Sequence, residues 1–189
     1  MNEQLLESGR VYRTAHLRRW SANPTRLAAH LTERGALRRL SHGLYYAPRQ
    51  SRFGETPPSE AALLETFLNG SPYVLTGPAR WNALGLGSTA LFAHPLVYNM
   101  KRSGKLDLGG RTFLFRQVAF PLGPTPEWFV VDLLRNAEAA GASRSTLEAN
   151  LARAVAIGRF DADMLLAMAS RYGRLQEQDA VRRALAIAR

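Results

Sequence analysis

The chain of 189 residues contains no cysteine, which excludes a disulfide framework and a thiolate metal site. It has only two lysines, Lys101 and Lys105, although arginine is abundant. No window approaches about 18 uninterrupted apolar residues, so we expect no transmembrane helix. Residues 1–7 are acidic and lack an apolar core, so they do not predict a signal peptide. These absences favour a cytoplasmic protein that does not enter a membrane.

Charge is the unusual bulk property, because the formal net charge is +10 and the sequence pI is near 10.9. Such a surplus attracts polyanions, meaning nucleic acid, an anionic membrane or an acidic protein. Residues 1–50 carry nine arginines against three acidic residues, a net +6, whereas residues 51–120 carry +3 and residues 121–189 carry +1. Arginine suits phosphate and guanine recognition. A GC-rich coding genome also replaces lysine by arginine without a functional reason, and both explanations stay open.

The most informative stretch, Arg13 to Pro48, predicts a winged helix-turn-helix, that is, two helices followed by a short hairpin. In the second helix, over residues 23–34, Asn23 is a favourable N-cap and Pro24 fits the first helical position, where a missing N–H costs nothing. Gly35 can adopt the left-handed conformation that ends a helix. The helical spacing of three apolar residues predicts that their face packs inward: Leu27, Ala28 and Leu31.

The elements around this helix complete the motif. Leu5, Leu6 and the residues before Gly9 are expected to form a further helix beneath the other two. Residues 14–20 predict a helix with Thr14 as its N-cap and Trp20 in the core. Leu37 to Leu40 and Leu44 to Ala47 predict two strands that turn at Ser41-His42-Gly43. A generic helix–hairpin unit without a DNA-binding role is the alternative.

The outer face of the helix over 23–34 suits the major groove of DNA. It is expected to present Thr25, Arg26, Ala29 and Glu33, flanked by His30 and Thr32. A guanidinium and hydroxyls can read base edges, and a small alanine allows close approach. Four neighbouring arginines are expected to hold phosphates. The candidate DNA-binding residues are Arg18, Arg19, Asn23, Thr25, Arg26, Ala29, His30, Arg38, Arg39 and His42.

The middle of the chain predicts a linker and a small α/β module. Arg49 to Pro58, with its prolines and Gly54, is the clearest linker. The module, residues 59–120, should begin with a helix over residues 60–68 that is capped by Ser59 and ended by Asn69-Gly70. Further expected elements are a strand over 73–76, a short helix through 81–84, a strand over 96–100, and a hairpin that turns at Gly109-Gly110.

The end of the chain has helical periodicity over residues 127–140, 145–157, 161–172 and 176–188. Ser145 and Glu148 have the spacing of a capping box. The expected helical core consists of Val130, Val131, Leu133, Leu134, Leu151, Val155, Leu165, Leu166, Met168 and Leu185. The fold class is therefore α+β. It comprises a winged helix-turn-helix domain at 1–50 and a second domain at 55–189, made of the α/β module 59–120 and a helical region 126–189.

No set of residues predicts catalysis, a metal or a cofactor. Four scattered histidines (16, 30, 42 and 94) lack the i, i+4 pairing of a helical metal site. Asp161 and Asp163 have the spacing of a carboxylate pair in nucleotidyltransferases. No Gly-Ser element precedes this pair, and Asp161 is placed to cap a helix. Gly85 to Ala90 only partly matches a phosphate-binding loop.

These motifs resemble the AbiEi antitoxins of type IV toxin–antitoxin systems and related bacterial winged-helix proteins. The matching pieces are Leu31 to Tyr45, Tyr73 to Pro78, Trp81 to Leu86 and Val97 to Val118, in the order of the family. They span roughly residues 10 to 120. The resemblance implies an N-terminal DNA-binding domain, a C-terminal domain needed for antitoxicity, and repression of its own operon through inverted repeats. It also implies a nucleotidyltransferase-like toxin as partner.

Three hypotheses follow. The leading one is a DNA-binding regulator of antitoxin type, with double-stranded DNA as its ligand and no enzymatic activity. The second is a protein-interaction module that docks a partner through the winged helix. The third is an enzyme, a nucleotidyltransferase that would use Asp161. The sequence does not predict the operator or the oligomeric state.

Overall fold

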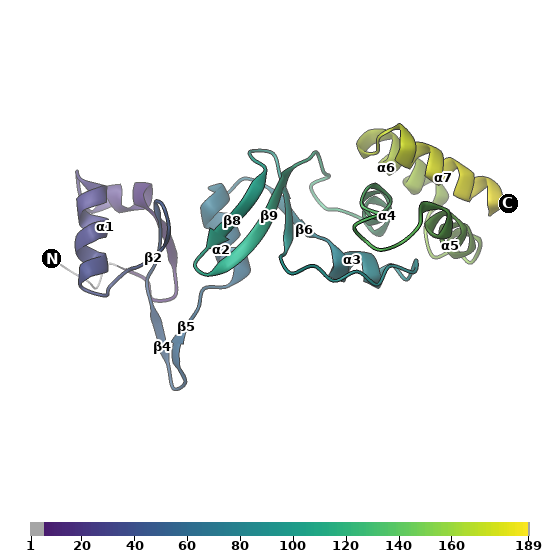
Figure 1. Cartoon of the computed structure of the whole chain (residues 1–189). Coiled ribbons are helices and arrows are strands. Elements are labelled where there is room, and N and C mark those ends of the chain that lie inside the picture. Colours follow the sequence, from purple (N-terminus) through teal and green to yellow (C-terminus); the bar gives the residue numbers. More distant parts are fainter. Residues whose placement is uncertain (1–5, 189) are drawn as a thin grey trace. The chain divides into compact units, whose positions relative to one another are not determined.

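The computed structural model describes residues 6–188 of the chain (Figure 1). It is mixed α and β, in agreement with the predicted α+β class. The chain divides into two compact units. Unit 1 extends to Pro72 and includes Lys105–Phe113, whereas unit 2 consists of Tyr73–Gly104 and the chain from Leu114 onward. The predicted domains, 1–50 and 55–189, are defined by motif rather than by compactness and stay a prediction.

Unit 1 contains a three-stranded antiparallel sheet. Its strands are β1 (Val11–Arg13), β3 (Leu44–Tyr46) and β2 (Arg38–Ser41), hydrogen-bonded in the order β1-β3-β2. A 3₁₀ helix, η2 (Thr14–Arg19), and helix α1 (Pro24–Glu33) connect β1 to β2. The buried face of α1 packs in a core formed by Tyr12, Leu17, Leu27, Ala28, Leu31, Leu37 and Ala47. The predicted inward face of this helix is therefore confirmed.

The strand register assigns side chains to the two faces of this sheet. Tyr12, Tyr45 and Arg39 are aligned across β1, β3 and β2. Because Tyr12 and Tyr45 pack in the core that includes α1, this face is the one that α1 covers. Tyr46 is aligned with Arg38 and is buried on the opposite face. Arg38 and Arg39 therefore point to opposite sides of the sheet.

Two expectations for the N-terminal segment need correction, and one strand was not expected. Residues 6–10 form a bend and a turn rather than a helix, and Leu5 lies outside the described residues. Thr14 is the first residue of η2, whose N-cap is Arg13. Strand β1 is not predicted by the sequence, because three residues are too few to show alternation. The predicted hairpin from Leu37 to Ala47 is confirmed as β2 and β3.

The segment Arg49 to Pro58, predicted as a linker, instead contains a second hairpin. Strand β4 (Arg49–Ser51) pairs antiparallel with β5 (Gly54–Thr56), and the two lie side by side in Figure 1. The Tyr46 hydroxyl donates a hydrogen bond to the carbonyl of Thr56. This bond, together with the backbone pairing, orders a polar segment that composition alone marks as irregular.

Unit 1 also contains helix α2 (Glu60–Leu68) and strand β8 (Gly104–Leu108), which turns into β9 (Arg111–Gln117). Ser59 caps α2 by accepting a hydrogen bond from the amide of Ala62, as predicted. The left-handed Asn69 ends this helix. The backbone amide of Gly109, at the predicted turn, donates to the carbonyl of Leu40 at an N···O distance of 3.0 Å.

Unit 2 combines strands with four helices of the C-terminal region. Strand β6 (Tyr73–Thr76) is antiparallel to β7 (Leu96–Asn99), which pairs in parallel with Leu114–Gln117 of β9, so the strand order in this unit is β6-β7-β9. Helix α3 (Pro78–Ala83) follows β6. The remaining helices are α4 (Pro126–Arg135), α5 (Arg144–Ala156), α6 (Ala162–Tyr172) and α7 (Leu175–Ile187). Helix α4 packs on α6, and α5 packs on α7.

The predicted helical core of unit 2 is largely confirmed, with one correction to the core and two to the helix ends. Leu166 is exposed rather than buried, because it lies on the outer side of α6. Helix α4 ends at Arg135, and the chain continues in turns to residue 141. Ser143, rather than Ser145, caps α5, since the Ser143 hydroxyl accepts from the amide of Thr146. The capping box predicted from Ser145 and Glu148 is therefore wrong.

Candidate nucleic-acid interface

The N-terminus of α1 is held by a set of local hydrogen bonds. The side-chain oxygen of Asn23 accepts from the backbone amide of Arg26, with an N···O distance of 3.0 Å. The Ser21 hydroxyl in turn accepts from the amide of Asn23, at 3.1 Å. Pro24 occupies the first helical position. Asn23 therefore contributes as a cap that fixes the first turn of α1, as its sequence context predicts.

The outer face of α1 is open to solvent. Thr25, Arg26, Ala29, His30 and Glu33 are all exposed, so the predicted orientation of this face is confirmed. Thr32 is partly buried, and its hydroxyl donates to the carbonyl of Ala28 at an O···O distance of 2.7 Å. The hydroxyl hydrogen of Thr32 is therefore used in a hydrogen bond within the helix. The polar groups on the outer face are therefore Thr25, Arg26, His30 and Glu33.

Arg18 and Arg19, at the end of η2, are both exposed. The Arg19 guanidinium carbon lies 4.0 Å from the centroid of the Trp20 ring, a cation–π geometry that restricts the side chain. Trp20 itself is partly buried against the core that contains α1, in keeping with its predicted packing role. The Trp20 ring therefore holds the Arg19 guanidinium near the core that contains α1.

The structure separates Arg38 from Arg39. Arg39 lies on the α1 side of the sheet, and its Nε donates to the carbonyl of Ser41 at 3.4 Å. Arg38, on the other side, forms an ion pair with Glu55 of β5, with Nη2 2.8 Å from Oε2. Its side chain remains 63% exposed. The two adjacent arginines, predicted as equivalent phosphate contacts, therefore have different surroundings.

Two hairpin turns add exposed residues next to the sheet. His42 lies at the turn between β2 and β3 and is exposed. Arg52 and Phe53 form the tip of the β4–β5 hairpin, where Phe53 is 86% exposed and the Arg52 guanidinium carbon lies 4.6 Å from its ring centroid. The sequence interpretation missed this tip. An arginine and an aromatic residue before a glycine are the available signal.

Four of the five candidate arginines of this surface have no carboxylate partner in the described part of the chain. Among residues 6–188, ion pairs involve Arg10, Arg38, Arg111, Arg144, Arg182 and Arg183, but none involves Arg18, Arg19, Arg26 or Arg39. Unpaired guanidinium groups can bind an external anion without first breaking an internal contact. Within the same residues, Arg135, Arg153 and Arg171 of the C-terminal helices also form no ion pair, so the position of the four arginines around α1, and not the lack of a partner alone, favours an interface there.

Nearby positive charge also affects the pKa of His16, which lies in η2. Its Nδ1 accepts from the amide of Arg13 at 3.3 Å. Burial lowers the pKa of His16, and the nearby cations Arg13, Arg10 and Arg19 lower it further. Both effects favour the neutral imidazole, whose Nδ1 accepts the backbone bond and so has a structural role.

Net charge counted by structural unit is distributed differently from net charge counted over residues 1–50, 51–120 and 121–189. Unit 1 contains twelve basic and seven acidic residues, a net +5, and unit 2 contains thirteen and eight, also +5. The surplus is therefore not confined to the unit that contains α1. The evidence for an interface comes from the unpaired cations around α1 rather than from net charge.

Unit 2 contains a buried polar cluster centred on Asp132 of α4. Its carboxylate accepts hydrogen bonds from Trp81 Nε1 at 2.8 Å, from the Thr76 hydroxyl, and from Asn136 Nδ2 at 3.1 Å. Asn136 Nδ2 also donates to the Tyr98 hydroxyl at 3.0 Å. Burial raises the pKa of Asp132, and the hydrogen bonds from Thr76, Tyr98 and Trp81 oppose this shift. The cluster ties β6, α3 and β7 to α4.

Asp161, one of the residues considered for catalysis, has a structural role. The Asp161 carboxylate accepts from the amide of Met164 at 2.7 Å and caps α6, as predicted. Within residues 6–188 no group of three or more histidine, aspartate or glutamate side chains is placed to hold a metal ion. In the same part of the chain no helix has both the length and the apolar character needed to cross a bilayer.

Comparisons of the chain with protein-family models and with curated proteins found no match. The resemblance to AbiEi antitoxins therefore stays a hypothesis that depends on the motifs of the sequence.

Proposed function

We propose that this protein is a DNA-binding transcriptional regulator of the antitoxin type. Helix α1 enters the major groove, and the β2–β3 hairpin acts as the wing of a winged helix-turn-helix. The observation that carries the proposal is the exposed outer face of α1, with Arg26 on it and Arg18, Arg19 and Arg39 nearby without ion-pair partners.

The residues of this surface divide into two roles. Thr25, Arg26 and His30 supply groups that can contact base edges, and Ala29 leaves room for the groove. Arg18, Arg19 and Arg39 supply positive charge for phosphates, which carries no sequence information. Asn23 fixes the first turn of α1 and so positions Arg26. The contribution of Arg38 depends on its release from Glu55.

A gel-shift experiment with the region upstream of the gene tests the proposal. With three arginines on phosphates, log K should fall with log salt at a slope of about −3. The upstream fragment should also bind at least about 10³-fold more tightly than a scrambled duplex of equal length. Absence of binding to both duplexes at low salt contradicts the proposal.

The antitoxin part of the proposal rests on the motifs from Leu31 to Tyr45 and on the later matching segments. It gives the protein a nucleotidyltransferase-like toxin as partner and autoregulation through inverted repeats. Co-expression tests it directly. A toxic nucleotidyltransferase-like protein encoded beside this gene should stop growth alone and permit growth with this chain. If growth stays arrested when this chain is produced in soluble form, the antitoxin role is wrong.

A protein-docking role for α1 is the second candidate, and Glu33 favours it. This exposed carboxylate lies on the outer face, where it would repel a phosphate backbone. Glu33→Gln separates the two roles. The variant should bind DNA more tightly than the wild type if α1 enters a groove. If α1 docks a protein instead, wild type and variant should have the same affinity for DNA.

A further inference from the structure

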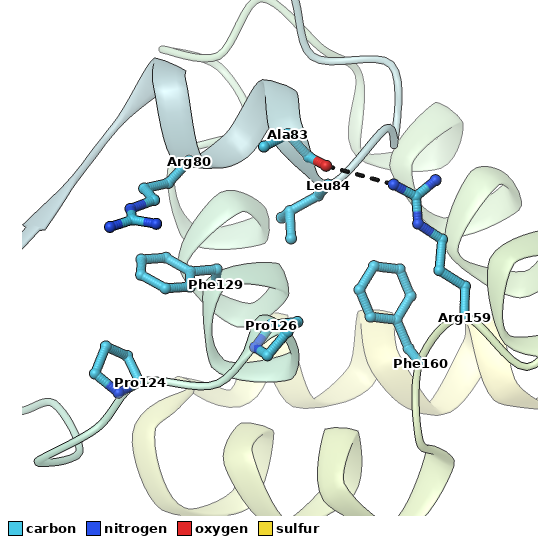
Figure 2. Close-up of a pocket in the computed structure, with 8 residues that line it drawn as sticks. All are labelled: Arg80, Ala83, Leu84, Pro124, Pro126, Phe129, Arg159 and Phe160. Carbon is cyan, nitrogen blue, oxygen red and sulfur yellow. Dashed lines mark hydrogen bonds between the residues drawn. The ribbon is translucent and has the colours of Figure 1, made fainter.

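Unit 2 contains an open pocket that lies outside the proposed DNA interface (Figure 2). Its volume is about 410 Å³. The lining combines apolar side chains, among them Leu84, Phe129 and Phe160, with the guanidinium groups of Arg80 and Arg159. These residues come from α3 and its C-cap Leu84, from α4, and from the segment between α5 and α6. No acidic side chain contributes to the lining.

Each arginine lies beside an aromatic ring. The Arg80 guanidinium carbon is 5.5 Å from the centroid of the Phe129 ring, and that of Arg159 is 5.9 Å from the centroid of Phe160. Figure 2 shows the two guanidinium groups on opposite sides of the pocket, with both rings between them. In the part of the chain that the structure describes, neither arginine forms an ion pair. Two cations therefore flank an apolar space whose lining has no acidic side chain, and the neighbouring Glu127 carboxylate accepts from the amide of Asp161.

Arg159 is positioned by the end of α3 and by the glycine that follows it. Its Nη2 donates to the carbonyl of Ala83 at 3.4 Å. A Cβ atom at Gly85 would lie only 2.7 Å from Nη1 of Arg159, so the absence of a side chain there makes room for the guanidinium. Gly85 also has a φ of +65°, which other residues rarely adopt. A side chain that is already positioned loses less conformational entropy when it binds an anion.

We propose that this pocket binds an acidic segment of a partner protein. A carboxylate of the segment pairs with Arg80 or Arg159, and a neighbouring aromatic or branched apolar side chain packs on Phe129 and Phe160. Charge complementarity selects the acidic group, because the lining offers cations and no anion. The apolar rings select a side chain beside that group. This inference does not depend on DNA binding, which uses the other unit.

The openness of the pocket favours a segment of a protein over a free small molecule. Arg80, Ala83, Pro126 and Arg159, half of the lining, are exposed. Sites for small molecules usually enclose about 70–90% of the ligand surface. A lining as exposed as this one can cover one face of a side chain that belongs to a protein segment. The rest of the segment can then contact the surrounding surface.

Fluorescence anisotropy with the full chain and a labelled peptide, Asp-Asp-Phe-Asp-Asp, tests this proposal. We expect saturable binding that weakens about tenfold or more in Arg80→Ala and in Arg159→Ala. Arg171→Ala is the matched control, because Arg171 also lies over an aromatic ring, that of Tyr172, but does not line the pocket. The peptide Asp-Asp-Ala-Asp-Asp, with the same charge, should bind about tenfold more weakly than the first peptide.

Arg80 is the more informative position if Arg159→Ala lowers stability, since Arg159 contacts the end of α3. Four results would overturn the proposal: no saturable binding up to about 1 mM peptide, equal binding of the two peptides, an equal loss in Arg171→Ala, or displacement of the peptide by a DNA duplex that competes through Arg80. The last result would identify a phosphate site instead. Gel shifts with Arg80→Ala keep the two proposals apart, because DNA binding through α1 should be unchanged in this variant.

Discussion

Arg38 and Glu55 form an ion pair between β2 and β5, with Nη2 of the arginine 2.8 Å from Oε2 of the glutamate. The pair links the sheet that carries α1 to the β4–β5 hairpin. It also occupies a cation that the sequence predicts as a phosphate contact. The Glu55 side chain is only 23% exposed, whereas that of Arg38 is 63% exposed, so Arg38 can reach solvent anions once the carboxylate is removed.

We therefore expect Glu55→Gln to strengthen binding to every duplex. The substitution removes one negative charge and frees Arg38 for a phosphate, so the salt slope should become steeper by up to about one unit. Titration of duplex DNA at several salt concentrations measures this. A control substitution, Glu60→Gln, removes the partner of Arg111 and should leave the slope unchanged. Equal slopes for wild type and Glu55→Gln would show that Arg38 does not contact DNA.

Arg39 should contribute more to DNA affinity than Arg38. It lies on the α1 side of the sheet and has no carboxylate partner among the described residues. Arg39→Ala should weaken binding to specific and random duplexes alike and reduce the salt slope by about one unit. Arg38→Ala should reduce the slope by less, because Glu55 already neutralises that guanidinium. The reverse order of the two effects would place the duplex on the other face of the sheet.

Loss of the Asn23 cap should lower stability and DNA binding together. Asn23→Ala removes the acceptor for the Arg26 amide, which costs about 1 kcal/mol of unfolding free energy. Denaturant titration measures this cost. Asn23→Asp keeps an acceptor at the same position and should retain most of the stability. If Asn23→Ala and Asn23→Asp are equally destabilised, the hydrogen bond to Arg26 does not stabilise the start of α1.

Asp132 should be the most sensitive polar position of unit 2. Asp132→Ala leaves the buried Trp81 Nε1 and the Thr76 hydroxyl without their acceptor, so we expect a loss of about 3 kcal/mol of unfolding free energy. Denaturant titration at neutral pH measures it. Asp163→Ala removes an exposed carboxylate of α6 and should cost no more than about 1 kcal/mol. Similar losses in the two variants would contradict the role of the cluster.

The same cluster predicts a pH dependence. Burial raises the pKa of Asp132 above its ordinary value of 3.8, so the folded state keeps this proton to higher pH than the unfolded state does. The folded state then binds more protons, and the contribution of Asp132 to stability falls as pH rises from about 4 through the folded-state pKa. The difference in unfolding free energy between wild type and Asp132→Ala should therefore be smaller at pH 7 than at pH 4. A difference that grows with pH would contradict the raised pKa.

The sequence predicted α1 well because its signals are local. An N-cap, a proline and a terminal glycine each act within one turn, so Asn23, Pro24 and Gly35 define the helix without the rest of the fold. The β4–β5 hairpin has only three-residue strands and no apolar alternation, and its order depends on Tyr46 and Glu55. Tertiary contacts of this kind are not visible in a local pattern.

The candidate site could likewise be predicted from the sequence only where local patterns determine it. Exposure of Arg26 and Ala29 follows from helical periodicity, and the structure confirms it. The separation of Arg38 from Arg39 depends on strand register, and the Asp132 cluster and the pocket bring together residues from several elements. Asp132 is 56 residues from Thr76 and 51 residues from Trp81 in the sequence. No spacing rule brings such residues together before the fold is known.

The binding preference of Arg26→Ala tests the central claim most directly. In a competitive gel shift, the upstream fragment and a scrambled duplex of equal length are titrated with wild type and variant at one salt concentration. If the outer face of α1 reads bases, Arg26→Ala should lower the preference for the upstream fragment by about 1–3 kcal/mol, with binding to the scrambled duplex reduced far less. An unchanged preference, or an equal loss on both duplexes, would show that α1 does not read the sequence.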